Sequence, residues 1–427
     1  MKTAIVILFI PIVAMAGFKE IQRITIDSNP SYDNYDRKEI AFSQTLKSVA
    51  YPVKKDNKVS ISVNGKIQEA TYDCISGVTF LPGTESVVFL ASRDGCKSLF
   101  WVVNGKEYSK YISSKSRVFT YSPPLKQFVY VGAENNKEFI VIDGEAQKKR
   151  YDRIDFITFM NDGKTIVFKA KEKESEFIVV NDKEHKKYKM VRDIRFSEFS
   201  DIYYLATDGS TEFLVINGKE QQKFPGGVYY YCTSRDSRKF ITISNDKKNI
   251  VINVDKKTFR FPLMKNSRPL FCKFAPNSTD YSFIAPDPEN ADRTAIYLNG
   301  NKMGSYEDIL WSSNQNSIAF SPDSTKFAYV VKEGKREALY VNENKLAVHD
   351  KFYKVIFSPD SAHIVYTYQD KDEQIGFSLG LDAKTFRNIS SISESPDGPP
   401  FIFDGSDRVR YIYEDNNGFY YVEEIVN

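Results

Sequence analysis

Two nearly identical segments constrain the fold of this chain more than any other feature of its sequence. Residues 320–331 read FSPDSTKFAYVV, and residues 357–368 read FSPDSAHIVYTY. Each segment joins a short apolar start to a Pro-Asp-Ser turn, and a β-type run that ends on an aromatic residue follows. Fainter copies occur along the whole chain. The sequence therefore predicts a strand–turn–strand unit that is repeated many times.

The aromatic residue that ends the second strand marks the period of the repeat. Successive marks lie between 36 and 46 residues apart, close to the length of a four-stranded propeller blade. The marks are Tyr51, Phe89, Tyr130, Phe168 and Tyr204, then less regularly Thr242 and Phe283, and finally Tyr329, Tyr366 and Tyr411.

A second marker gives the other half of each unit. An apolar run is followed by Asn-Gly or a close relative, as in Asn64-Gly65, Asn104-Gly105 and Asn217-Gly218. These pairs favour the two-residue turns that join antiparallel strands. Tyr72-Asp73 and Tyr151-Asp152 then precede the next unit, where we expect the chain to cross to a new sheet. Each unit is thus predicted to be a sheet of four strands, and no helical periodicity is apparent after the N-terminus.

We expect an all-β fold, a single closed β-propeller of about eight to ten four-stranded units. The last unit has three predicted strands, and residues 20–27 form an isolated strand-like run before the first unit. Pairing between them would complete that blade and remove its open edge. Because ten units exceed the usual four to eight blades, a wide ring, two smaller propellers and a degenerate unit all remain open. We favour one ring because both chain ends contribute to the same blade.

The N-terminus predicts export. Residues 1–16 combine Lys2, an apolar run and Ala14-Met15-Ala16, which is typical of a cleaved signal peptide. The run is too short for a membrane span, and the residue directly after the cleavage site is Gly17 rather than a cysteine, so we expect no lipoprotein anchor. We therefore expect residues 17–427 to form the propeller and to be secreted or periplasmic.

Composition argues against several classes of ligand. The chain has 59 basic and 56 acidic residues, so no basic excess points to nucleic acid. It has only three histidines, in unrelated positions, and its four cysteines show no C-x-x-C spacing. We expect no metal, no cofactor and a monomeric chain.

The Phe-Ser-Pro-Asp-Ser signature resembles the WD40-like β-propeller repeat of the TolB type, which also occurs in prolyl oligopeptidases and tricorn-like proteases. The resemblance is strong at residues 320–331 and 357–368 and recognisable at 159–168 and 274–278. The sequence departs from TolB because the residues before the repeats do not read as an α/β domain. It departs from prolyl oligopeptidases because it has no G-x-S-x-G elbow. The resemblance implies a protein-binding propeller without catalytic residues.

One face of the predicted propeller collects the variable loops. The crossovers and the loops between the second and third strands lie on the same side, away from the Pro-Asp turns, and variable loops on a rigid scaffold often carry function. For the aromatic residues, packing between blades is the alternative that we prefer. The candidate binding residues on this loop face are Tyr72, Arg93, Asp94, Tyr151, Asp208, Asp287, Arg293, Trp311, Lys332 and Arg336.

The cysteines and aspartates have mainly structural interpretations. Cys74 and Cys96 are both expected on the loop face, where a disulfide between them is plausible. Cys232 and Cys272 differ in register by one residue, so we expect them on opposite sheet faces, free and buried. Asp323 and Asp360 follow proline in turns, where aspartate commonly caps the backbone.

We therefore expect an exported, non-enzymatic scaffold that binds a protein or a cell-envelope component through the loop face. The alternative is a propeller enzyme acting on carbohydrate or peptide in the central channel, and a structural surface protein is a third possibility. The enzyme would need carboxylates on the first strands. Runs such as 156–159 and 271–274 carry Phe, Thr, Ile, Cys and Lys there, so the enzyme ranks second.

Overall fold

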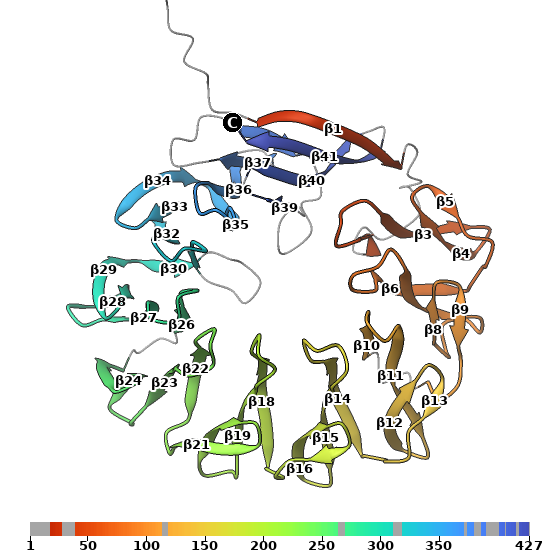
Figure 1. Cartoon of the computed structure of the whole chain (residues 1–427), viewed down its shortest axis with the longest axis horizontal. Helices are drawn as coiled ribbons and strands as arrows, with labels where there is room; N and C mark the ends of the chain where they lie inside the picture. Colours follow the sequence, from red (N-terminus) through yellow and green to blue (C-terminus); the bar gives the residue numbers. More distant parts are fainter. Residues whose placement is uncertain are drawn as a thin grey trace, which may run out of the picture.

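The computed structural model describes residues 18–27, 39–112, 118–263, 270–310, 318–370, 374–379, 386–389, 401–405, 407–415 and 418–426. The predicted signal peptide at residues 1–16 and the candidate residue Trp311 lie outside this described part. The described strands form ten antiparallel sheets, arranged as a ring in Figure 1. Across the described residues, no helix is long and apolar enough to cross a membrane. The predicted all-β propeller is confirmed.

The sheets are numbered here as blades 1 to 10 in chain order. Blades 1 to 5 consist of β2 (Ala41–Phe42), β3 (Val49–Lys55), β4 (Lys58–Val63) and β5 (Lys66–Ile67); β6 (Cys74–Phe80), β7 (Val87–Ser92), β8 (Phe100–Val103) and β9 (Lys106–Tyr108); β10 (Phe119–Ser122), β11 (Gln127–Glu134), β12 (Lys137–Ile142) and β13 (Glu145–Ala146); β14 (Arg153–Phe159), β15 (Ile166–Glu172), β16 (Ser175–Val180) and β17 (Lys183–Glu184); β18 (Met190–Phe196), β19 (Ile202–Thr207), β20 (Glu212–Ile216) and β21 (Lys219–Phe224).

Blades 6 to 10 follow the same order. They consist of β22 (Val228–Thr233), β23 (Phe240–Asn245), β24 (Asn249–Val254) and β25 (Lys257–Pro262); β26 (Phe271–Phe274), β27 (Tyr281–Asp287), β28 (Asn290–Leu298) and β29 (Asn301–Tyr306); β30 (Asp308–Leu310), β31 (Ile318–Phe320), β32 (Phe327–Glu333), β33 (Arg336–Val341) and β34 (Asn344–His349); β35 (Lys351–Phe357), β36 (Ile364–Asp370), β37 (Gln374–Leu379) and β38 (Phe386–Ile389); β39 (Phe401–Asp404), β40 (Arg408–Asp415), β41 (Gly418–Val426) and β1 (Phe18–Asp27).

Blade 10 is built from both ends of the chain. The N-terminal strand β1 pairs antiparallel with β41, with Phe18 opposite Val426 and Asp27 opposite Phe419. It is the fourth strand of a sheet whose other three strands are the last three of the chain (Figure 1). The predicted completion of the last unit by the N-terminal strand is therefore confirmed.

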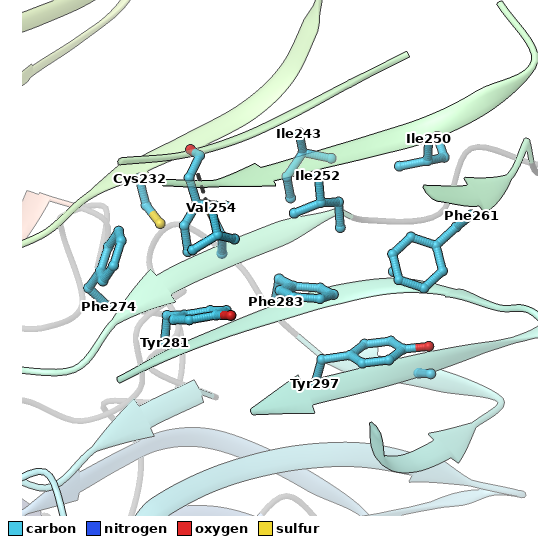
Figure 2. Close-up of a cluster of buried hydrophobic side chains, with 14 residues drawn as sticks. Cys232, Ile243, Ile250, Ile252, Val254, Phe261, Phe274, Tyr281, Phe283 and Tyr297 are labelled. Atoms are coloured by element: carbon cyan, nitrogen blue, oxygen red, sulfur yellow. Dashed lines mark hydrogen bonds between the residues drawn. The ribbon is translucent and has the colours of Figure 1, made fainter. Parts of the chain in front are cut away.

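The hydrophobic core lies between the blades. Side chains from blades 6 and 7 meet in one such cluster, in which the rings of Phe283 and Tyr297 stack 4.8 Å apart beneath Ile243 and Ile252 (Figure 2). A strand with a neighbouring blade on each side buries both of its faces. All six residues of β7 are buried accordingly, and the strand reads as a continuous apolar run.

The first and last blades also share a cluster of this kind. Phe419 and Tyr421 of β41 are buried together with Val49 and Tyr51 of β3. The ring of Phe42 packs edge-on against Phe419, with centroids 5.6 Å apart. The inter-blade packing thus joins blade 10 to blade 1, which agrees with one ring rather than two smaller propellers.

The Asn-Gly turns hold each blade together from within. Asn64 and Gly65 both have positive φ, as a type I′ turn requires. The side-chain oxygen of Asn64 accepts a hydrogen bond of 2.8 Å from the backbone N–H of Val49. Asn217 makes the same contact with the N–H of Ile202, at 2.9 Å. Asparagine thus both adopts the turn conformation and satisfies the first N–H of the second strand.

The Pro-Asp turns link one blade to the next. Ser321 Oγ donates to the Asp323 carboxylate at 2.6 Å, and this hydrogen bond is the main reason that the pKa of Asp323 lies well below its usual range. The backbone N–H of Asp323 donates to Ser361 Oγ of the following blade at 3.0 Å. The N–H of Asn277 donates to Ser324 Oγ in the same way. The Asp323 carboxylate therefore caps its own turn. A serine in the corresponding turn of the following blade ties the two neighbouring blades together.

The first strand of a blade is called its inner strand. Glutamates of the preceding blade hold several inner strands in position. A bulge interrupts the pairing of β18 between Arg192 and Arg195. Next to it, the backbone N–H of Val191 donates to Glu176 Oε2 of blade 4 at 2.9 Å. Phe352 of blade 9 donates in the same way to Glu337 of blade 8. These bonds satisfy backbone groups at the start of the two inner strands and fix their positions relative to the neighbouring sheets.

Replacing a ring in an inter-blade cluster should destabilise the fold strongly. For Phe283→Ala we expect a loss of about 3–5 kcal/mol in the free energy of unfolding, because the cavity lies between two sheets that cannot collapse freely. Urea unfolding followed by circular dichroism measures this loss. Phe199→Ala is the control, since that ring is 67% exposed and its loss should cost less than about 0.5 kcal/mol. Equal losses in the two variants would contradict the assignment of the core.

Candidate functional site

A hollow of about 650 Å³ lies on the inner strands of blades 5 to 8, where these strands enter the Pro-Asp turns. Such a volume falls within the range of small-ligand and side-chain binding sites. Three basic side chains and one acidic side chain take part in its lining. The lining residues are Arg195, Phe196, Ser197, Glu198, Tyr230, Cys232, Thr233, Ser234, Arg235, Phe271, Cys272, Lys273, Phe274, Ala275, Pro276, Phe320 and Pro322.

The two basic residues on the strands occupy the same place in the repeat. Arg195 of β18 and Lys273 of β26 each stand two residues before the first residue of the following turn. Blade 6, which lies between them, has Cys232 at this place, and blade 8 has Ala319. The register therefore places two cations in the lining of the hollow, on blades 5 and 7 with blade 6 between them.

Arg195 is held by two aromatic rings and a carbonyl group. Its guanidinium carbon lies 4.5 Å from the ring centroids of both Tyr230 and Tyr231. Its Nη1 group donates a hydrogen bond of 2.6 Å to the backbone oxygen of Tyr231. Cation–π contacts of this kind are stabilising and fix the plane of the guanidinium group. Arg195 is thus oriented by uncharged partners.

Lys273 is half-buried and has an uncharged partner as well. Its ammonium group donates to the backbone oxygen of Ile318 at 3.0 Å. Burial lowers the pKa of Lys273, with the nearby Cys232 thiol acting in the opposite direction. Among the described residues, neither Lys273 nor Arg195 forms a salt bridge. The acidic residue of the lining, Glu198, instead pairs at 2.7 Å with Arg235, and both of these side chains are exposed.

Aromatic rings supply the apolar part of the hollow. Tyr230 and Phe271 lie 5.4 Å apart across blades 6 and 7. Phe196 stacks on Phe156 of blade 4, with centroids 6.0 Å apart, and Phe320 lines the side formed by blade 8. Rings on β-strands are rigid and expose large contact areas. The hollow therefore offers flat apolar surfaces next to positive charge.

Cys232 and Cys272 are free and buried, as the sequence predicts. They belong to one inter-blade cluster, and burial raises the pKa of the Cys272 thiol, with Cys232 contributing in the same direction (Figure 2 shows Cys232). The sequence predicts opposite sheet faces for the two residues. The residues lie in adjacent blades, however, and the opposite faces of two adjacent sheets meet each other. The register argument therefore brings these thiols together instead of separating them.

The predicted loop-face residues Tyr72 and Arg93 are in contact. Tyr72 is 2% exposed, forms a β-bridge with Val59, and belongs to the cluster between blades 1 and 2. The Arg93 guanidinium lies 4.8 Å from its ring centroid and pairs with Glu107, which also accepts a 3.4 Å hydrogen bond from the Tyr72 hydroxyl. Tyr151 is similarly buried between blades 3 and 4. Both tyrosines therefore pack between blades, which is the role that we prefer for the aromatic residues in the sequence analysis over a role in binding.

The predicted aspartates on this face have local partners. Asp94 accepts hydrogen bonds from Ser92 Oγ and from the N–H of Ser98. Asp208 accepts from the N–H groups of Ser210 and Thr211 within its own turn. Both carboxyl groups have a lowered pKa because of these bonds. Each aspartate therefore caps the loop in which it lies.

Residues 286–293 form no long loop, contrary to the sequence-based expectation. Strand β27 continues to Asp287, and β28 begins at Asn290, with a register shift after Pro286 that accommodates the proline. Asp287 is buried and pairs with Lys302 at 2.8 Å. Arg293 donates to the backbone oxygen of Ser305 at 2.6 Å. These two candidate residues are thus bound into blade 7.

The remaining candidates lie on other blades. Lys332 is exposed on blade 8, and Arg336 contacts Asp350 and Asp370 at 3.1 and 3.0 Å. Cys74 and Cys96 form a disulfide within blade 2, with Cα atoms 5.7 Å apart. The structure brings Tyr72 together with Arg93 and distributes the other described candidates over blades 2 to 8. None of the nine predicted binding residues that the structure describes lines the hollow.

The sequence analysis missed the residues of the hollow because it ranked loops above inner strands. They could have been predicted from charged residues at a position of the repeat that is otherwise uncharged. Arg195 and Lys273 replace small or apolar residues at one position of the inner strand, beside aromatic residues. Among the described residues, no group of three or more His, Cys, Asp or Glu side chains is arranged to hold a metal ion.

The similarities of this chain to known proteins are similarities to solved structures. No protein-family model matches the sequence, and no curated protein is similar to it. A eukaryotic initiation factor structure is similar with a TM-score of 0.46 and 11% identity, covering 86% of this chain and 91% of the other. The Dos1 propeller has a TM-score of 0.36 and 8% identity, covering 96% of each chain. The tricorn protease has a TM-score of 0.36 and 11% identity, covering 91% of this chain and 48% of its own. At these TM-scores the similarities carry no argument about function.

The charge on Lys273 should make stability depend on pH in the alkaline range. Because burial lowers its pKa below the ordinary value of 10.5, the folded chain releases this proton at lower pH than the unfolded chain. Stability therefore rises with pH between the lowered folded-state pKa and 10.5. Urea unfolding at a series of pH values should show wild-type stability rising relative to that of Lys273→Met across this interval. A constant difference between the two would contradict the burial of a charged ammonium group.

Proposed function

We propose that this chain is an exported, non-enzymatic β-propeller of the TolB type that binds a protein partner of the cell envelope. The hollow on blades 5 to 8 carries the proposal. It combines Arg195 with the rings of Tyr230, Phe271 and Phe320 in one concave site. Arginine and aromatic residues are the side chains enriched at the centres of protein interfaces.

The scaffold suits this role because it holds the site rigidly. Each inner strand that lines the hollow is packed between two other blades, and the turns at its end are linked by hydrogen bonds such as that from Asp236 N–H to Ser278 Oγ. A site on rigid strands needs little ordering when a partner binds, so less affinity is lost to entropy. We further propose that the chain acts as a monomer and does not bind nucleic acid, since its basic and acidic residues are nearly balanced.

Blocking the hollow should prevent partner binding. Thr233 lines the hollow on blade 6, and Thr233→Trp would fill it without adding charge. Purified residues 17–427 carrying a photo-crosslinker at Phe320 should label one envelope protein, and Thr233→Trp should lower the yield at least tenfold. Lys248→Trp is the matched control, because Lys248 is exposed on a loop of the same blade at the other face.

A third variant tests the predicted loop face directly. Lys332→Trp places the same ring on an exposed loop-face position of blade 8. Loss of crosslinking in Lys332→Trp together with full crosslinking in Thr233→Trp would assign binding to the loop face and reject the hollow. Unchanged yields in all three variants would reject both surfaces as protein-binding sites.

Export should remove the first 16 residues. The Ala14-Met15-Ala16 sequence predicts cleavage before Gly17. N-terminal sequencing of the chain recovered from the periplasm or the medium of an expressing bacterium should therefore begin at Gly17. A chain in which residues 2–16 are deleted should stay in the cytoplasm. Recovery of uncleaved Met1 from the membrane fraction would contradict this expectation and indicate an anchored protein.

A further inference from the structure

We propose that the hollow recognises an acidic peptide segment, in which a carboxylate binds between Arg195 and Lys273 and a neighbouring apolar side chain contacts the aromatic rings. The inference rests on the proposed protein-binding function and names the chemistry of the segment that is bound. The hollow is lined by three basic side chains and a single acidic one, so its lining has an excess of positive charge.

The two strand cations lack the carboxylate partner that partly buried cations usually have. Two other half-buried cations on or beside the inner strands do have carboxylate partners: Lys169 of β15 contacts Asp155 and Glu176 at 3.2 Å, and Arg192 of β18 contacts Glu212 at 2.9 Å. Arg195 and Lys273 form no salt bridge among the described residues. Withdrawing a charge from water without an opposite charge is unfavourable. A carboxylate brought by a ligand would supply the missing partner to both residues.

The donors are already oriented for such a ligand. Two tyrosine rings and the backbone oxygen of Tyr231 fix the plane of the Arg195 guanidinium. The guanidinium also has a side-chain hydrogen bond with Tyr230. It carries five N–H groups, and a planar guanidinium pairs with a carboxylate through two parallel hydrogen bonds. Lys273 approaches from the blade after next, so its ammonium group provides a second positive charge at the same hollow.

The aromatic surfaces favour a peptide over a free anion. Tyr230, Phe271 and Phe320 line the hollow together with the two cations, and Phe196 continues the surface towards blade 4. A small anion would leave these rings exposed to water. A chain segment with an acidic residue next to an aromatic one would cover them and bury apolar area, which adds affinity. The exposed pair of Glu198 and Arg235 lies at the rim, where charge affects approach more than affinity.

Fluorescence anisotropy with two labelled nonapeptides tests the inference. One peptide alternates Glu and Phe, and the other alternates Gln and Phe. We expect residues 17–427 to bind the acidic peptide at least tenfold more tightly and to lose affinity as KCl is raised. The double variant Arg195→Gln, Lys273→Gln should weaken acidic-peptide binding at least tenfold. The control Lys247→Gln, Lys248→Gln removes the same charge from an exposed turn of blade 6 and should bind like wild type.

The conservative variant Lys273→Arg keeps the charge and should keep most of the affinity, which separates recognition from misfolding of the double variant. Equal binding of the two peptides would overturn the carboxylate inference while leaving a peptide-binding hollow. Acidic-peptide binding that is unchanged in the double variant would also overturn it, because the cations would then be uninvolved. No binding of either peptide would overturn the inference as well, and crosslinking blocked by Thr233→Trp would still support the proposed function.

Discussion

The packing of each sheet against two neighbours is the interaction on which the rest of this structure depends. A four-stranded sheet with apolar residues on both faces cannot be stable alone in water. In this chain every described sheet shares one cluster with the sheet before it and another with the sheet after it, as blade 6 does with blades 5 and 7. Stability is therefore distributed round the ring, and few positions on the middle strands are free to change.

This constraint determines where function can reside. The side chains of the second and third strands of a blade are mostly buried in the clusters between blades, and so are many side chains at the crossovers. Tyr72 and Tyr151 are buried between blades, although their position beside variable loops suggests exposure. The inner strands are different, because their side chains near the Pro-Asp turns leave room for a hollow of about 650 Å³. Arg195 and Lys273 depart from the repeat at one position of these strands, and both side chains line the hollow.

The sequence predicts the fold almost completely, because the same turn-forming residues recur in many of the units. Asn64-Gly65 and residues 320–326 each identify a turn from local rules, and the period then assigns the strands between them. The site was harder to predict, because it depends on which side chains from different blades meet. Cys232 and Cys272 illustrate this. Their register predicts opposite faces of a sheet, but the two residues lie in adjacent sheets whose opposite faces pack together. The strand at Pro286 was missed because proline in a strand depends on a bulge, which is a tertiary feature.

The composition of blade 10 has a consequence for how the protein is made. Its sheet needs β1 from the start of the chain and β39 to β41 from the end. During synthesis from the N-terminus, β1 therefore waits without its partner while nine blades form behind it. Contacts between such distant segments are slow to form, and an unpaired strand is exposed to intermolecular association in the meantime. Completion of the ring is thus a late event, because β1 can join blade 10 only after β41 has been made.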